Sequence, residues 1–263
     1  LKMMASQYAR ISYRWLVAIP FFGLSTLAIG LPLIVISLMG FGDLGSRTLA
    51  VLWAKLNSIV LRMQVTVEGR DNIKPQQSYV LVANHESALD ILLIYGYLPI
   101  ELKWVMKKEL RRVPIIGGAC AAMGHILIDR SNSTQAVESI QNASAKLTQG
   151  MSVMFFPEGT RSSDGRILPF KKGAFRLAVD LSIPVLPITI EGTRNMLPTG
   201  TLDWRPGRVA LRIHPALQTA ELTSRSVAEL SNRAESMIRQ QPGNEHNLST
   251  TDEVLPSCEK ITS

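Results

Sequence analysis

The chain has 263 residues, enough for one domain with a full hydrophobic core and a short appendage. Its composition (46% hydrophobic, 19% charged, mean hydropathy +0.14) favours membrane association without indicating a polytopic protein. The net charge of +7 indicates an anionic partner, which can be nucleic acid, a membrane surface or a phosphorylated substrate. Two distant cysteines exclude a disulfide framework, and no cysteine or histidine spacing predicts a metal site.

The first predicted element is apolar, since residues 15–42 carry no charged side chain. A helix needs about 20 residues to span a bilayer. Gly30 and Pro32 interrupt the segment, and together they permit a sharp bend there. One straight span and a bent pair of helices inserted from one side are therefore both open, beside a buried helix of a soluble protein. We assign residues 1–43 to a membrane-anchoring helical segment.

The rest of the chain alternates helical patterns with short apolar runs. An amphipathic pattern opens this part, and a polar stretch without periodicity ends it, which predicts a disordered tail over residues 241–263. The alternation predicts an α/β domain over residues 44–240, with a central, mostly buried sheet flanked by helices. The expected helices are 46–63, 88–97, 113–123, 132–150, 174–181 and 224–239, and the expected strands are 65–69, 79–83, 102–106, 125–128, 153–156, 185–190 and 208–213.

The first candidate for chemistry is a histidine with an aspartate five residues on, His85 and Asp90. On one continuous helix the two would point apart, because five residues turn the helix by about 500°. They can meet if His85 lies just before the helix and Asp90 one turn inside it, which the cap-like residues Asn84 and Ser87 permit. The carboxylate then fixes the imidazole tautomer and leaves the other nitrogen to act as a general base. A structural histidine at a strand end is the alternative.

The second candidate is a turn that follows the expected strand 153–156. Gly159 allows a close approach of the backbone, and Arg161 can hold a phosphate with two hydrogen bonds. Ligand sites in α/β folds lie beyond the carboxyl ends of strands, so the turn predicts a phosphate site, with an ordinary surface turn as the alternative. The sequence has no P-loop, dinucleotide fingerprint or nucleophile elbow.

Cations gather in the sequence near both candidates. As a set they can bind phosphates of a substrate, a cofactor or lipid headgroups, although a solvated face is the simpler reading for any one of them. Aromatic residues are sparse among them, so we expect no nucleic-acid partner. The residues concerned are Lys107, Lys108, Arg111, Arg112, Arg166, Lys171, Lys172 and Arg176.

Four ordered blocks between residues 60 and 215 resemble the glycerolipid acyltransferase family, specifically the 1-acyl-glycerol-3-phosphate acyltransferases. The first block is His-x4-Asp preceded by asparagine, and the third is Phe-Pro-Glu-Gly-Thr-Arg-Ser, here residues 156–162. The second block is residues 124–130, with Leu127 where the family has an aromatic residue. The fourth is a proline between hydrophobic residues, at 183–188. Four blocks in this order are far more specific than His-x4-Asp alone.

The resemblance implies an activity: His85 deprotonates the sn-2 hydroxyl of lysophosphatidic acid, Asp90 orients it, and phosphatidic acid is the product. The oxygen attacks the thioester of acyl-CoA or acyl-carrier protein directly, so these are co-substrates, and no enzyme nucleophile, metal or cofactor is expected. The substrate-binding residues that the resemblance implies are Glu158, Gly159, Thr160, Arg161, Lys107, Lys108 and Arg130.

The resemblance also implies a place in the cell. The N-terminal helical pair is expected to embed in one leaflet of the inner membrane, with anionic lipids as partners and the active site facing the cytoplasm. Three alternatives stay open. The acceptor can be another lysolipid, such as a lyso-ornithine lipid or lysophospholipid, or glycerol-3-phosphate. A non-catalytic membrane protein of the same fold is more remote, because the residues of the blocks are intact, and a nucleic-acid module conflicts with the apolar N-terminus.

Overall fold

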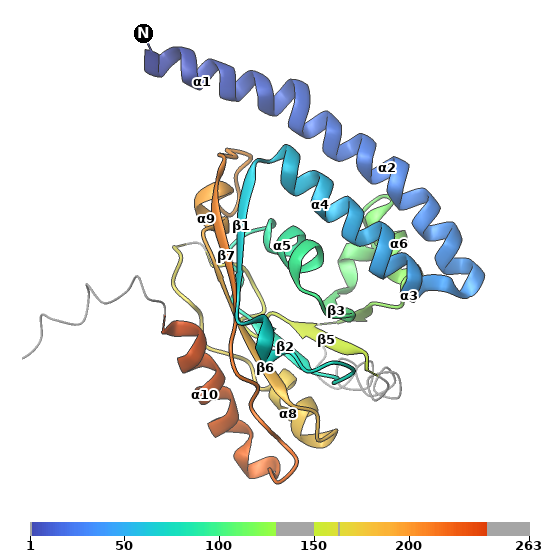
Figure 1. The fold of residues 1–263 in the computed structure, drawn as a ribbon, viewed down its shortest axis with the longest axis vertical. Helices are drawn as coiled ribbons and strands as arrows, with labels where there is room; N and C mark the ends of the chain where they lie inside the picture. Colours follow the sequence, from blue (N-terminus) through green and yellow to red (C-terminus); the bar gives the residue numbers. More distant parts are fainter. Residues whose placement is uncertain (1, 130–149, 163, 241–263) are drawn as a thin grey trace, which may run out of the picture.

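The computed structural model describes residues 2–129, 150–162 and 164–240, and it has a seven-stranded sheet at its centre (Figure 1). The strand order is β1-β7-β6-β2-β5-β3-β4. Strands β2 to β6 are parallel to one another, whereas β7 runs antiparallel to β6 and parallel to β1. The strands are β1 (Met63–Glu68), β2 (Val80–Ala83), β3 (Leu102–Lys107), β4 (Ile126–Ile128), β5 (Ser152–Phe155), β6 (Val185–Glu191) and β7 (Gly207–Ile213).

Helices cover both faces of the sheet, as Figure 1 shows. On one face lie α8 and α10, and on the other lies α5, with α4 packed on it. This is the α/β architecture with a buried sheet and flanking helices that the sequence predicts. The helices are α4 (Val51–Val60), α5 (Asp90–Tyr97), α6 (Ile116–Ala122), α8 (Gly173–Asp180), α9 (Thr193–Met196) and α10 (Val227–Arg239).

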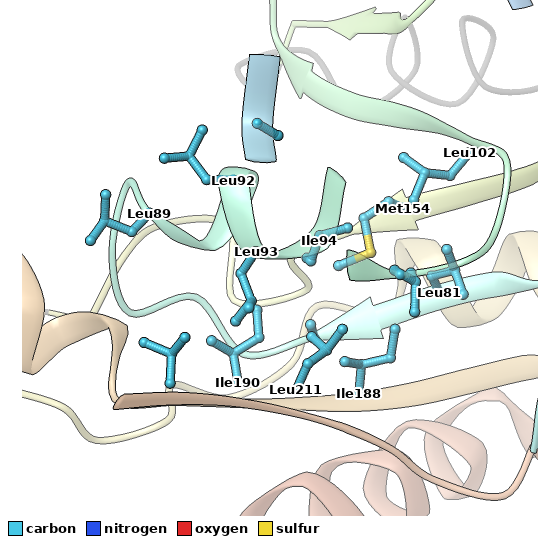
Figure 2. Packing of buried hydrophobic residues seen from close by; sticks show 14 of the residues in the cluster. Leu81, Leu89, Leu92, Leu93, Ile94, Leu102, Met154, Ile188, Ile190 and Leu211 are labelled. Atoms are coloured by element: carbon cyan, nitrogen blue, oxygen red, sulfur yellow. The ribbon is translucent and has the colours of Figure 1, made fainter. Parts of the chain in front are cut away.

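The hydrophobic core has two halves, one on each face, because side chains alternate along a strand. On β2, Val80 and Val82 face the half under α8 and α10, whereas Leu81 and Ala83 face the half under α5. Figure 2 shows that second half, where leucines of α5 meet Leu81 and isoleucines of β6. All four β2 residues are buried, so the strand that precedes His85 is held rigidly from both faces.

The N-terminal segment is a helical hairpin. Helix α1 (Lys2–Tyr13) continues through a π-helical turn (Arg14–Ala18) into α2 (Ile19–Ile36), and α4 returns alongside α2. Asn57 of α4 hydrogen-bonds to Ser25 of α2 at 3.1 Å, which joins the two arms. The bend that Gly30 and Pro32 permit does not occur there: α2 runs through Pro32, and the chain reverses at Gly40, where φ is +94°. Glycine adopts this left-handed conformation without strain.

The hairpin has a largely exposed apolar surface. Within the described residues, the helical stretch Tyr8–Val60 is long and apolar enough to cross a membrane, and only 22% of its most apolar window is buried in the protein. This surface suggests membrane association. The reversal at Gly40 favours the bent-pair alternative over one straight span.

Most predicted elements of the domain lie within a few residues of the observed ones. The expected helix 113–123 begins later than predicted, because a 3-10 helix η5 (Lys108–Arg112) and an extended Val113 precede α6. The short helix α9 was not predicted. The expected helix 132–150 and tail 241–263 lie outside the described residues, and the domain boundaries stay predictions.

Candidate active site

The site begins where β2 ends and the chain enters the loop before α5. Asn84 fixes this loop to β6, because its side-chain Oδ1 accepts from the backbone N–H of Ile190 and its Nδ2 donates to the carbonyl of Ile190, both at 2.8 Å. The side-chain amide thus makes the two hydrogen bonds that the backbone N–H and C=O of a neighbouring strand would make. His85 is the next residue, so its backbone position is set by the rigid end of the sheet.

His85 and Asp90 meet with His85 before the helix, as predicted, but Asp90 begins α5 instead of lying one turn inside it. Asp90 is the first residue of α5, and its Oδ2 lies 2.7 Å from Nδ1 of His85. The same oxygen accepts from the backbone N–H groups of Glu86 at 2.8 Å and Ser87 at 3.0 Å. A carboxylate is an acceptor, so Nδ1 carries the proton and Nε2 is left with a lone pair.

A third group holds Asp90 from the far side. The hydroxyl of Thr193, at the start of α9, donates to Oδ1 of Asp90 at 2.5 Å. The Asp90 side chain is fully buried, so four hydrogen-bond donors compensate for its desolvation. Thr193 lies about a hundred positions away in sequence, and no sequence pattern pointed to it.

Removing the hydroxyl of Thr193 tests this arrangement. In Thr193→Val, Oδ1 of a buried carboxylate loses its donor, which is expected to cost about 1–3 kcal/mol of the free energy of unfolding and to lower kcat. Thr193→Ser keeps the hydroxyl and should remain near wild type in both. Denaturant unfolding and initial rates measure the two effects, and a stable, fully active Thr193→Val protein would contradict the role.

The imidazole of His85 is also held face to face by an aromatic ring. Phe156 stacks on it with ring centroids 3.8 Å apart and an interplanar angle of 8°, and Trp104 packs on Phe156. The His85 side chain is 17% exposed, and no described residue hydrogen-bonds to its Nε2. The ring is thus fixed in orientation while its basic nitrogen is open to a substrate.

Glu158 connects the second candidate to the first. Its Oε1 accepts from the backbone N–H of His85 at 2.7 Å, and its Oε2 accepts from that of Leu168 at 2.8 Å. Burial raises the pKa of this carboxyl, and the two backbone donors oppose that shift. Both oxygens are used inside the protein, and a carboxylate repels a phosphate. Glu158 therefore positions His85 and the turn, and its binding of an acceptor stays a prediction.

The turn after Glu158 has the shape that the sequence predicts. Gly159 has a φ of +75°, and a Cβ there would lie 2.8 Å from Nζ of Lys171. Thr160 and Arg161 follow at the surface, with Arg161 exposed beside this loop. The backbone N–H of Ser162 donates to the carbonyl of His85 at 3.0 Å. Residues 158–162 thus lie next to the dyad, although their binding of an acceptor stays a prediction.

The remaining predicted cations lie farther along the same edge. Lys107 is the last residue of β3, and Lys108 follows it. Strand β5 separates β3 from β2, so roughly 10 Å of sheet lies between these lysines and the end of β2. Both lysines are exposed, and Lys108 forms an ion pair with Asp129. Arg130 lies outside the described residues. No cluster of metal-ligating side chains occurs in the described part of the chain.

Glu86 is a neighbour of the dyad that the sequence analysis missed. Burial, and then the charge of Asp90, raise its pKa to about 7, while Arg194 opposes the shift. Nearby, the guanidinium of Arg194 packs against Gly165, where a Cβ would lie 2.5 Å from Nη1. The hydroxyl of Thr199 contacts the carbonyls of both Glu86 and Ser162, which joins the two loops.

The raised pKa of Glu86 predicts a pH dependence of stability. The folded protein binds this proton more tightly than the unfolded chain, whose pKa is near 4.5. Its contribution to stability is therefore present below about pH 4.5 and is lost as the pH rises toward 7 and above. We expect wild type to lose stability between pH 5 and 8 relative to Glu86→Gln. Urea unfolding across this range measures the difference, and parallel curves for the two proteins would contradict it.

The fold and the site define a class of protein: an α/β protein with a histidine that a buried carboxylate orients, and such a histidine can act as a base toward a hydroxyl. Comparison with known proteins agrees with this class. The Acyltransferase family model matches residues 64–191. Residues 64–191 therefore carry an acyltransferase domain of this family.

The relatives are similar over most of the chain. It is 35% identical over 208 residues to a 1-acyl-sn-glycerol-3-phosphate acyltransferase of Chlamydomonas reinhardtii, covering 78% of this chain and 61% of that protein. It is 36% identical over 172 residues to the human 1-acyl-sn-glycerol-3-phosphate acyltransferase alpha, covering 65% and 61%. The chain thus spans about three fifths of the length of these curated relatives.

A solved structure has the same fold. It is the crystal structure of the 1-acyl-sn-glycerophosphate (LPA) acyltransferase PlsC from Thermotoga maritima, which aligns with a TM-score of 0.64 and 29% identity. The alignment covers 84% of this chain and 95% of that one.

Proposed function

We propose that the protein transfers an acyl chain from an acyl thioester to the sn-2 hydroxyl of lysophosphatidic acid, which gives phosphatidic acid. The observation that carries this proposal is the orientation of His85, with Nδ1 bound to Asp90 and Nε2 open. Relatives named for this activity, matched over about three fifths of their length, support the choice of acceptor.

The proposed reaction needs one base and no enzyme nucleophile. The lone pair of His85 Nε2 takes the hydroxyl proton as the acceptor oxygen attacks the thioester carbonyl. Asp90 stabilises the imidazolium that results. The C–S bond then breaks, and the imidazolium returns the proton to the departing thiolate. The donor is acyl-CoA or acyl-carrier protein as a co-substrate, and no cofactor takes part.

The membrane supplies the acceptor in this proposal. The exposed apolar surface of the hairpin inserts into one leaflet of an anionic membrane, which we take to be the inner membrane with the active site on the cytoplasmic side. Lysophosphatidic acid has a single acyl chain and would reach His85 from the bilayer without crossing water.

The test is acyl transfer by detergent-solubilised protein with an acyl-CoA donor. Lysophosphatidic acid is compared with a panel of other lysolipids and with glycerol-3-phosphate, and His85→Ala is run beside wild type. A His85-dependent preference for lysophosphatidic acid is expected. A preference for another acceptor would keep the mechanism and refute the substrate. If no acceptor reacts, also with acyl-carrier protein as donor, the proposed activity is wrong.

Arg161 is expected to act through the acceptor. Loss of a charge-assisted hydrogen bond to phosphate costs about 1.5–3 kcal/mol, so Arg161→Ala should raise the KM for lysophosphatidic acid by roughly 10- to 100-fold, with a smaller effect on kcat. Arg166→Ala is the matched control, because Arg166 is exposed in the same loop and pairs with Asp164. An unchanged KM in Arg161→Ala would show that Arg161 does not bind the phosphate.

A further inference from the structure

An exposed segment lies between β3 and α6, at the carboxyl ends of the parallel strands, where His85 also lies. All eight residues from 107 to 114 are exposed. Two of them are large apolar residues with no cover, Leu110 at 44% and Val113 at 36% exposure. Four others are cationic, and only Glu109 is acidic. Exposed apolar side chains among cations are typical of a surface that contacts an anionic bilayer.

The segment is rigid, although it is exposed. A Cβ on Gly117 would lie 2.3 Å from the carbonyl oxygen of Arg111, so α6 packs directly against the backbone of η5. The backbone N–H of Gly117 donates to the carbonyl of Val113 at 2.8 Å, and that of Val113 donates to the carbonyl of Leu110 at 3.1 Å. The positions of Leu110 and Val113 are therefore fixed by the fold.

The segment also adjoins the apolar hairpin. A Cβ on Gly30 of α2 would lie 2.5 Å from Cγ2 of Ile115, so α2 approaches the end of the segment as closely as glycine allows. Leu27 and Leu31 of α2, on either side of Gly30 in sequence, are exposed. The contact at Ile115 thus holds the end of the segment, two residues after Val113, against α2. Figure 1 shows α2 and α6 side by side, in agreement with their packing.

The segment lies on the same side of the sheet as His85, at the carboxyl ends of the parallel strands. Strand β3 is parallel to β5 and β2, so Lys107 at its end lies on the same side of the sheet as His85. Trp104 of β3 contacts Phe156, which stacks on His85. A contact between the segment and a bilayer would therefore hold the dyad at a fixed position near the lipid surface.

We propose that residues Lys108–Val113 form a second membrane contact: Leu110 and Val113 enter the headgroup boundary of an anionic bilayer, and Arg111 and Arg112 bind lipid phosphates. The contact turns the carboxyl ends of the parallel strands, where His85 lies, toward the bilayer into which α2 inserts. This inference rests on the membrane association in the proposed function, but not on the identity of the acceptor. A basic surface can also bind an acidic carrier protein or the phosphates of coenzyme A; the exposed leucine and valine favour the bilayer.

Environment-sensitive fluorescence tests the contact without turnover. In full-length protein with both cysteines replaced by alanine, Leu110→Cys carries the dye, with Leu31→Cys on α2 as the positive control and the exposed Asp180→Cys on α8 as the negative one. Vesicles are phosphatidylcholine alone or mixed with phosphatidylglycerol. We expect a blue shift and quenching by spin-labelled lipid at 110 and 31 but not at 180, and a stronger effect at 110 with phosphatidylglycerol.

Two outcomes would overturn the proposal. The first is a dye at 110 that stays in water while the dye at 31 is quenched. The second is equal insertion at 110 into both vesicle types, which would remove the role of Arg111 and Arg112. If the dye at 110 stays in water and Arg111→Glu/Arg112→Glu raises the KM for the acyl donor instead, the surface binds the donor.

A rate measurement completes the test. Leu110→Glu/Val113→Glu is expected to lower turnover of vesicle-borne lysophosphatidic acid by about tenfold and to leave turnover in detergent micelles unchanged. Arg111→Ser/Arg112→Ser is the second variant if the first does not fold. Equal turnover on vesicles for a folded variant and wild type would contradict the contact. Wild-type protein that inserts at 110 but does not acylate lysophosphatidic acid would refute the proposed acceptor and leave this inference standing.

Discussion

Replacing His85 with alanine is expected to lower kcat for acyl transfer by about 10²–10⁴-fold, because the hydroxyl of the acceptor loses its base. The variant should fold, since the His85 side chain is partly exposed and the loop is held by its backbone. The N–H of His85 donates to Glu158 and its carbonyl accepts from Ser162, and alanine keeps both bonds. Initial rates with saturating acceptor and donor measure the loss.

The control for this variant is a second histidine. His214 hydrogen-bonds to Thr189 at 2.7 Å, apart from the dyad, so His214→Gln should retain most of the activity. Circular dichroism and binding to vesicles should match wild type for both variants. Substantial turnover by a folded His85→Ala protein would exclude His85 as the general base.

Local rules predicted the dyad because its two residues are close in sequence. His85 precedes α5 and Asp90 begins it, and the observed 2.7 Å contact follows from that local geometry. Parallel strands also explain why the His85–Asp90 pair lies next to the turn that contains Gly159 and Arg161. Strand β2 pairs with β5, so their carboxyl ends, and the loops that follow, lie at one edge of the sheet.

The parts of the site that were missed depend on contacts between distant segments. Thr193 reaches Asp90 only because β6 pairs with β2, and a lone threonine has no sequence signal for this role. The bonds of the Glu158 carboxylate to two backbone amides, one of them in the other loop, were not predicted either. The type of a residue indicates what it can bind, but its partners depend on the fold.

The N-terminal hairpin also shows the limit of local rules. Proline and glycine both permit a bend, and composition cannot choose among several of them. Pro32 stays within α2, since a proline in a helix removes one hydrogen bond and needs a local adjustment rather than an end. The reversal occurs at Gly40, where α4 can return and pack against α2 through Asn57 and Trp53. The position of the turn at Gly40 thus depends on packing between α2 and α4.

Replacing Asp90 with asparagine is expected to lower kcat by up to about 10⁴-fold, because an uncharged amide cannot stabilise the imidazolium that forms during transfer. The shape of the pocket suits asparagine. Its oxygen can accept from His85 Nδ1, Glu86 and Ser87 as Oδ2 does, and its amide group can donate to the hydroxyl of Thr193. The loss should therefore appear in kcat with little change in the KM for either substrate.

A double-mutant cycle separates this electrostatic role from a structural one. If Asp90 acts through His85, Asp90→Asn should cost little further activity in a protein that already carries His85→Ala. The matched control is Asp180→Asn, which removes an exposed carboxylate that pairs with Arg176 on α8 and should leave kcat unchanged. Additive losses in the double variant would mean that Asp90 supports catalysis independently of His85, and the dyad mechanism would be wrong.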